Sequence, residues 1–318
     1  MTARALWITG PRRIELRAEA EPQGEVVVEA AFGGISRGTE SLVFAGRIPE
    51  GERARMRAPL QAGEFPFPVK YGYAAVGRVA AGPEALAGRT VFVLHPHQDR
   101  FAAPAAMCVP LPEGLEPRRA VLAANMETAL NVVWDSGAGP CDRIAVVGGG
   151  VVGALVAWLA GRIPGAEVTL IDVNPDRARL AATLGVGFAG PSGAPEGCDV
   201  AIHASGTGAG LATALAAAGP EATVVEASWH GDGAPAVPLG GAFHSQRLRL
   251  TSSQVGRVPP GRAPRWTNRR RMEAALGLLR ATELEALISG ETGFADLPEA
   301  YGAILDDPAT LCHVVRYR

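Results

Sequence analysis

The stretch Arg143-Ile144-Ala145-Val146-Val147-Gly148-Gly149-Gly150-Val151-Val152-Gly153 joins a β-branched run to three glycines and then to an apolar segment. The run over 143–147 is typical of a strand buried on both faces, and residues 151–162 have the pattern of a helix. The glycines match G-x-G-x-x-G between that strand and that helix, which is the context this motif requires. Gly148 permits a tight turn, Gly150 lets the backbone approach a pyrophosphate, and Gly153 allows close helix–strand packing.

The residues after this turn favour a dinucleotide site. The backbone amides of Val151 and Val152 begin the helix and would face the phosphates. Asp172 follows the next predicted strand, 167–171, where a carboxylate accepts hydrogen bonds from ribose hydroxyls and repels a 2′-phosphate. This favours NAD over NADP, although Arg177 lies near enough in sequence to soften the discrimination and leave NADP possible. The alternative is an ordinary glycine-rich turn followed by an acidic helix cap.

The pattern of strand-like and helix-like runs changes twice along the chain, which predicts three segments. Residues 1–120 hold short strand-like runs separated by Gly and Pro, typical of a barrel-like β domain. Residues 121–253 alternate strands with helices, which predicts a doubly wound parallel sheet of the Rossmann type. Residues 254–318 end in the strand-like run Cys312–Arg316, which needs a sheet to join, and we expect it to return to the first domain. The predicted fold class is therefore α/β.

Composition excludes several classes of function. The chain has 318 residues, with 30 Lys and Arg against 32 Asp and Glu. Because its net charge is close to zero, the protein has no overall electrostatic field that would attract nucleic acid or anionic membranes. It has no run of about 20 apolar residues and no sign of a secretory signal at its beginning. The four Cys include no C-x-x-C pair. We expect a cytoplasmic protein that acts on a small molecule, without nucleic-acid or membrane partners.

Two further motifs resemble the medium-chain dehydrogenase/reductase superfamily. They are Gly33-Gly34-Ile35-Ser36-Arg37-Gly38-Thr39-Glu40 and Tyr71-Gly72-Tyr73-Ala74-Ala75-Val76-Gly77, and the later stretch Leu297-Pro298-Glu299-Ala300-Tyr301 is similar to the family's closing helix. The resemblance covers nearly the whole chain and implies a GroES-like first domain, a nicotinamide cofactor and a homodimer. Within the superfamily, the G-I-S-x-G-T-E signature resembles the bacteriochlorophyllide a dehydrogenase branch.

The chain departs from the zinc-dependent members of that family. They have a Cys where Ser36 stands and a His where Tyr73 stands, and neither replacement is a good zinc ligand. The four-cysteine structural zinc lobe is also missing. We therefore predict no catalytic and no structural zinc. An alternative metal set would be His95, His97 and Glu127.

Without a metal, a hydrogen-bond donor or general acid must balance the charge on the substrate oxygen. The catalytic candidates are Tyr73, His97, Ser36, Thr39 and Glu127, with Tyr73 and His97 ranked first. Each has a structural alternative: Tyr73 can fill the space of the absent metal, Ser36 can belong to a turn, and His97 can be a hydrogen-bonded structural residue.

Further candidates concern the cofactor. Arg37 matches an arginine that contacts the pyrophosphate in zinc-dependent relatives. Ser205 and Trp229 follow predicted strands, at the sheet edge where ligands gather in this fold, and Trp229 can either stack on a ring or belong to the core. The run Arg269-Arg270-Arg271 begins a predicted helix, and we expect it to face solvent; the alternative is an anion site.

Together these features predict a zinc-independent, NAD(H)-dependent oxidoreductase that transfers hydride between nicotinamide and a secondary alcohol or ketone. The bacteriochlorophyllide resemblance implies a hydroxyethyl group as one substrate. One alternative is a quinone or enoyl reductase of the same fold, although such enzymes typically prefer NADPH and Asp172 argues against that preference. A second alternative is an NAD(H)-binding redox sensor without turnover.

Overall fold

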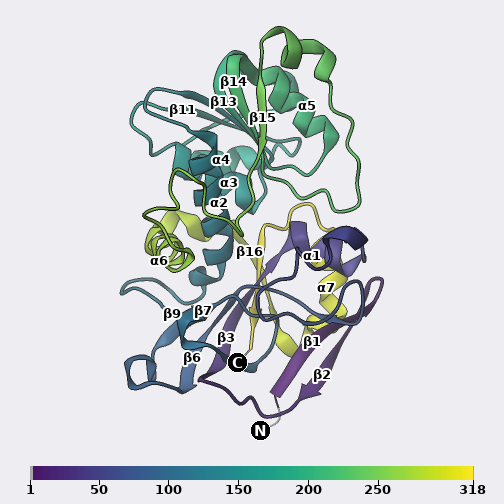
Figure 1. Ribbon diagram of the computed structural model, residues 1–318, viewed down its shortest axis with the longest axis vertical. Coiled ribbons are helices and arrows are strands. Elements are labelled where there is room, and N and C mark those ends of the chain that lie inside the picture. The colour runs from purple at the N-terminus through teal and green to yellow at the C-terminus, as the bar shows by residue number, and fades with distance from the viewer. Residues whose placement is uncertain (1–2, 318) are drawn as a thin grey trace. The chain divides into compact units, whose positions relative to one another are not determined.

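The computed structural model describes residues 3–317 and divides into two compact units (Figure 1). Unit 1 comprises Met1–Ala124 and Met272–Arg318, and unit 2 comprises Asn125–Arg271. The sequence placed the borders after residues 120 and 253. In the structure the second border lies after Arg271. The Arg271 side chain bonds to a helix of unit 2.

Unit 2 is built on a six-stranded parallel sheet with the order β12-β11-β10-β13-β14-β15. Its strands are β10 (Arg143–Val147), β11 (Glu167–Ile171), β12 (Gly187–Ala189), β13 (Cys198–His203), β14 (Ala218–Glu226) and β15 (Arg249–Ser252). Its helices include α3 (Val151–Ala160), α4 (Arg177–Leu184) and α5 (Gly208–Ala217), and α2 (Ala123–Ser136) begins at the border. This confirms the predicted doubly wound sheet. The strand order reverses between β10 and β13, the kind of position at which α/β sheets bind ligands.

Unit 1 contains two sheets. One is four-stranded, β2-β1-β5-β4, and the other is seven-stranded, β16-β17-β3-β6-β7-β9 with β8 also paired to β3. The strands are β1 (Ala3–Gly10), β2 (Arg13–Glu19), β3 (Val26–Ser36), β4 (Ala62–Gly63), β5 (Val69–Lys70), β6 (Ala75–Ala81), β7 (Thr90–Val93), β8 (Arg100–Ala103), β9 (Val109–Pro110), β16 (Ile288–Gly293) and β17 (Cys312–Arg316). The barrel-like β domain of the prediction thus takes the form of two sheets.

The last strand returns to unit 1, as its sequence predicted. Strand β17 pairs antiparallel with β3, and Cys312 lies opposite Ser36 at the end of β3. Helix α1 (Arg37–Phe44) starts at the next residue, and its Phe44 ring meets Tyr301 of α7 (Leu297–Asp306) edge-on at 5.2 Å. The end of β3 therefore leads directly into a helix that is packed on α7.

No helix among residues 3–317 is both long enough and apolar enough to cross a lipid bilayer.

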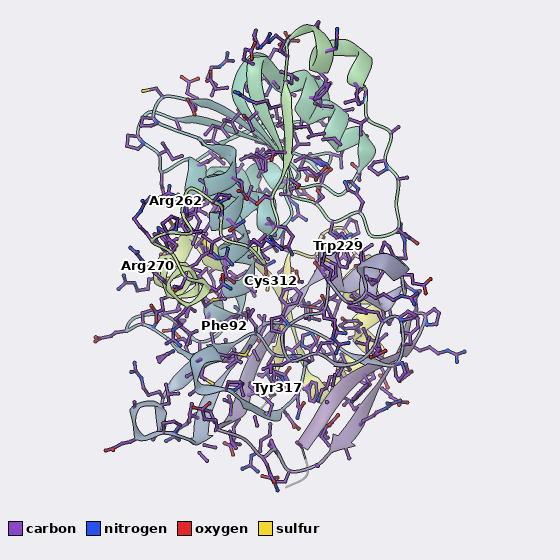
Figure 2. All side chains as sticks on the ribbon, in the orientation of Figure 1. Phe92, Trp229, Arg262, Arg270, Cys312 and Tyr317 are labelled. Atoms are coloured by element: carbon purple, nitrogen blue, oxygen red, sulfur yellow. The ribbon has the colours of Figure 1, made fainter. Side chains whose placement is uncertain are left out.

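The expectation that the arginine run faces solvent is wrong for Arg271. Its side chain is 2 % exposed, and its guanidinium donates to Glu127 Oε1 at 3.0 Å, to Asn131 Oδ1 and to the Val255 carbonyl. A buried guanidinium needs such partners, and α2 supplies the carboxylate and the amide oxygen. Arg270, which is labelled in Figure 2, is by contrast exposed. Its guanidinium carbon lies 4.1 Å from the centre of the Trp266 ring.

Replacing Arg271 tests this buried pair. Burial raises the pKa of Glu127, and the positive charge of Arg271 opposes that rise. Arg271→Met should lower the free energy of unfolding by about 3 kcal/mol near neutral pH, because an unpaired carboxylate remains buried.

The pH dependence of this loss follows from the same carboxyl. A carboxyl group whose pKa is higher in the folded than in the unfolded protein stabilises the fold at low pH. This stabilisation is lost as the pH rises through the folded-state pKa. Arg271→Met raises that pKa further, so chemical denaturation should show a larger loss at about pH 8 than at about pH 5. The exposed Arg257→Met serves as control. An equal loss at both pH values would contradict a buried charge pair.

Candidate functional site

The glycine turn after β10 has the geometry of a phosphate-binding loop. Gly148 has φ +110°, and a Cβ there would lie 2.6 Å from the Ser205 backbone nitrogen. A Cβ on Gly153 would lie 1.8 Å from the Gly148 carbonyl oxygen, so only glycine fits. At Gly150, the N-cap of α3, a Cβ would meet nothing within 4 Å. The protein therefore leaves open the space in front of Gly150, where the motif brings a pyrophosphate, and the amides of Val151 and Val152 follow in the first turn.

Asp172 directly follows β11, as predicted, and is held by the glycine loop. Its Oδ2 accepts from the Gly149 amide at 2.6 Å and its Oδ1 from the Asn174 amide at 2.7 Å. A Cβ on Gly149 would meet both Asp172 Oδ2 and the side chain of Arg177, so these two side chains flank the turn. Each carboxylate oxygen retains a further lone pair for a ribose hydroxyl. These residues thus fit an adenosine ribose, and Arg177 lies beside the turn where it would pair with a 2′-phosphate.

A second polar group lies at the carboxyl ends of β13 and β14. The register of these strands pairs His203 with Glu226, and the imidazole Nδ1 lies 2.7 Å from Glu226 Oε2. The other ring nitrogen, Nε2, lies 2.7 Å from Ser205 Oγ. His230 Nε2 also reaches Glu226 Oε2, at 3.3 Å. Trp229 is half-buried in the same loop after β14 (Figure 2), and its stacking role stays a prediction.

His203, Glu226 and His230 also have their ligand atoms within 4.8 Å of one another, which is near enough for a metal ion. However, the separation of 2.7 Å between His203 Nδ1 and Glu226 Oε2 is that of a hydrogen bond. A metal ion held by both atoms would have to displace the proton of this bond. The arrangement is thus a hydrogen-bonded cluster, and sequence reasoning assigned no role to Glu226.

In unit 1, the end of β3 gathers the predicted hydroxyl groups. The hydroxyl group of Tyr73 is hydrogen-bonded to the side chains of Ser36 and Thr39. Burial, and then the negative charge of Glu40, raise the pKa of Tyr73 to about 12, although the two hydroxyls lower it. Tyr73 therefore stays protonated at neutral pH and can donate a hydrogen bond. The structure brings together three of the five predicted catalytic residues.

His97 lies beside this group but is bound to another partner. Glu40 is 0 % exposed and accepts from His97 Nε2 at 2.9 Å, from the Tyr301 hydroxyl at 2.6 Å and from the Ser36 amide at 2.8 Å. Gly72 makes this possible: it has φ +118°, and a Cβ there would lie 2.9 Å from His97 Cδ2. The buried carboxylate thus links β3, α7 and the loop that contains His97.

The remaining candidates have other partners. Glu127 is paired with Arg271 in unit 2, and His95 is buried with its ring stacked on Phe101 at 3.8 Å. His97 is bound to Glu40, so each of the three residues has a partner within its own unit, and the alternative metal set stays a prediction. The Arg37 guanidinium donates to the Leu305 carbonyl at 3.0 Å, and its pyrophosphate contact stays a prediction.

Comparison with known proteins gives relatives over the whole chain. No family model matches the sequence. D-guloside 3-dehydrogenase of Escherichia coli K12 is 26 % identical over 333 aligned positions, covering 94 % of this chain and 95 % of the relative.

Two solved structures show the same architecture at 18 % identity. One is a dehydrogenase of Sinorhizobium meliloti 1021, described as zinc-binding and bound to NADP, with a TM-score of 0.79 and 100 % coverage of both chains. The other is described as a short chain alcohol dehydrogenase of Escherichia coli CFT073 complexed with NADH, with a TM-score of 0.80 and 99 % coverage of both chains. The chain thus has the fold of these two dehydrogenases. The expected bacteriochlorophyllide branch stays a prediction.

Substitution of Gly150 tests the phosphate cradle. Gly150→Ala should leave the thermal midpoint of the free protein unchanged, because the added Cβ meets no protein atom, and should strongly reduce the stabilisation by NAD or NADP. Gly193→Ala is the matched control, since a Cβ at that exposed position also meets nothing. Equal stabilisation of both variants by nucleotide would show that the phosphates do not approach Gly150.

Proposed function

We propose that the chain is an NAD(P)-dependent dehydrogenase that transfers hydride between nicotinamide and a secondary alcohol or its ketone. The open cradle at Gly150, flanked by Asp172 and Arg177, is the observation that supports it most directly. The curated relative is named as a guloside 3-dehydrogenase, and we extend this to a carbohydrate-like secondary hydroxyl as the substrate class. NAD is the preferred cofactor because Asp172 disfavours a 2′-phosphate, and we expect a homodimer.

The proposed activity is zinc-independent. At the two positions where zinc-dependent relatives have thiolate and imidazole ligands, this chain presents Ser36 and Tyr73. Tyrosine ligates a metal as the phenolate, and burial raises the pKa of Tyr73 to about 12 and so opposes that form. The hydroxyl group is therefore suited to donate a hydrogen bond and not to hold zinc.

The mechanism assigns the polarising role to this hydroxyl. When bound, the nicotinamide supplies the site that gives or takes the hydride. Tyr73 donates to the substrate oxygen and stabilises the negative charge that develops there. The hydrogen bonds of the Tyr73 hydroxyl group with Ser36 and Thr39 hold it in place. Glu40, through its bond to the Ser36 amide, keeps the end of β3 in place.

Removal of the tyrosine hydroxyl tests this role. Tyr73→Phe should lower kcat about 100-fold in the reduction of a panel of sugar-derived and simple ketones, which is a typical loss for a general acid or oxyanion donor. Tyr71→Phe, whose ring lies 6.0 Å from that of Tyr73, is the control. In the unmodified protein the rate should show no tyrosine ionisation between about pH 6 and pH 10. Equal turnover by both variants would reject Tyr73 as the donor.

Zinc independence has its own test. Protein purified without added metal should contain far less than one zinc per chain by elemental analysis, and its turnover should survive prolonged treatment with a chelator. Stoichiometric zinc whose removal abolishes turnover would contradict the proposal. If nucleotide raises the thermal midpoint but no alcohol, ketone, quinone or enoyl substrate changes the 340 nm absorbance, the redox-sensor alternative is favoured.

A further inference from the structure

A continuous line of hydrogen bonds runs through the switch-point edge of unit 2. It passes from Thr207 to Ser205 at 3.0 Å between hydroxyl oxygens, from Ser205 to His203 at 2.7 Å, and from His203 to Glu226 at 2.7 Å. His203 is 0 % exposed, whereas Ser205 is half-buried and Thr207 is exposed. The line thus leads from the surface at the carboxyl ends of the strands to a buried imidazole and its carboxylate.

The directions of these bonds follow from which groups can donate. A carboxylate only accepts, so the proton between His203 and Glu226 is on Nδ1. In the neutral imidazole, Nε2 is then an acceptor, and the Ser205 hydroxyl donates to it. Thr207 Oγ1 already accepts from the Gly210 amide at 3.0 Å, and its own hydroxyl donates to Ser205. The half-buried Ser205 Oγ therefore accepts from Thr207, while its own proton is donated to the imidazole of His203.

The surrounding structure fits closely around these atoms. A Cβ on Gly210 would lie 2.0 Å from Ser205 Oγ and 2.9 Å from His203 Nε2. Only a glycine at this position therefore lets α5 pack against these atoms. On the other side, Glu226 accepts from the Ser228 amide at 2.7 Å and from His230. Burial alone would raise the pKa of Glu226, but the bonds from His203, Ser228 and His230 together lower it, so the carboxylate is ionised.

We propose that Ser205, His203 and Glu226 form the base of the reaction, a proposal that rests on the dehydrogenase function proposed above. In oxidation, the substrate's C–H hydrogen leaves with its electron pair to the nicotinamide while a C=O bond forms. The alcohol O–H proton passes to Ser205 Oγ, and the Ser205 proton passes to His203 Nε2. The resulting imidazolium is neutralised by Glu226, with His230 as the other titratable group that faces this carboxylate. Reduction reverses each step.

The pH dependence of turnover tests the relay. Oxidation needs the neutral imidazole of His203 and reduction needs its protonated form, so kcat/KM should rise with pH for oxidation and fall with pH for reduction. Ser205→Ala should lower both rates about tenfold to a hundredfold and remove both trends, while Ser205→Thr, which keeps a hydroxyl, should retain them. Glu226→Gln should lower the rate of oxidation, because the imidazolium that forms at His203 loses its counter-charge.

Thr213→Ala is the control, because it removes only a helix-surface hydroxyl bound to the Ala209 carbonyl. Unchanged pH trends in Ser205→Ala, with hydride transfer intact, would overturn the relay and leave the dehydrogenase function standing. A complete lack of hydride transfer in the unmodified protein would overturn that function and the relay with it. The visible spectrum of Co²⁺ bound to His203 and Glu226 in the active protein would also overturn the relay, since the metal displaces the Nδ1 proton.

Discussion

The close approach of Gly153 to the Gly148 carbonyl is the constraint on which unit 2 depends. It holds the first turn of α3 against the end of β10, so the strand can enter the helix without a wider loop. The same turn places Gly148 against the backbone of Ser205, at the point where the strand order reverses. The glycine loop after β10 and the proposed proton relay through Ser205 are therefore parts of one packed edge of the sheet. A side chain at Gly148 or Gly153 would separate them.

Unit 1 is organised around a different constraint, a fully buried carboxylate. The carboxylate oxygens of Glu40 accept hydrogen bonds from the Ser36 amide, the Tyr301 hydroxyl and the His97 imidazole. These donors come from three separate parts of the chain. Removing any one donor would leave a buried charge short of a partner, which is costly in a low-dielectric interior. The hydroxyl group of Tyr73 lies next to this anion, which helps to keep it protonated. The role proposed for Tyr73 is thus coupled through electrostatics to the buried charge of Glu40.

Sequence patterns predicted the strands and the turn well where signals were local. Strands β10, β11 and β17 begin and end at the predicted residues, because apolar runs bounded by glycine, proline or charge leave little choice. The long-range partners were much harder to predict. Arg271 looked like part of a solvated arginine run, and Glu127 looked like a residue of the active site. Nothing near either residue in sequence indicates that they pair with one another across 144 residues of chain.

By itself, the sequence determined the α/β class, the glycine turn with Asp172, and the presence of hydroxyl groups where metal ligands stand in related enzymes. These features depend on residues within a few positions of each other, or on a single residue type at one position. Only the tertiary structure decided that His203 meets Glu226, that Glu40 holds His97 and Tyr301, and that Arg271 is buried. Such pairs form where strand register and helix packing bring distant residues together, and those are set by the whole core.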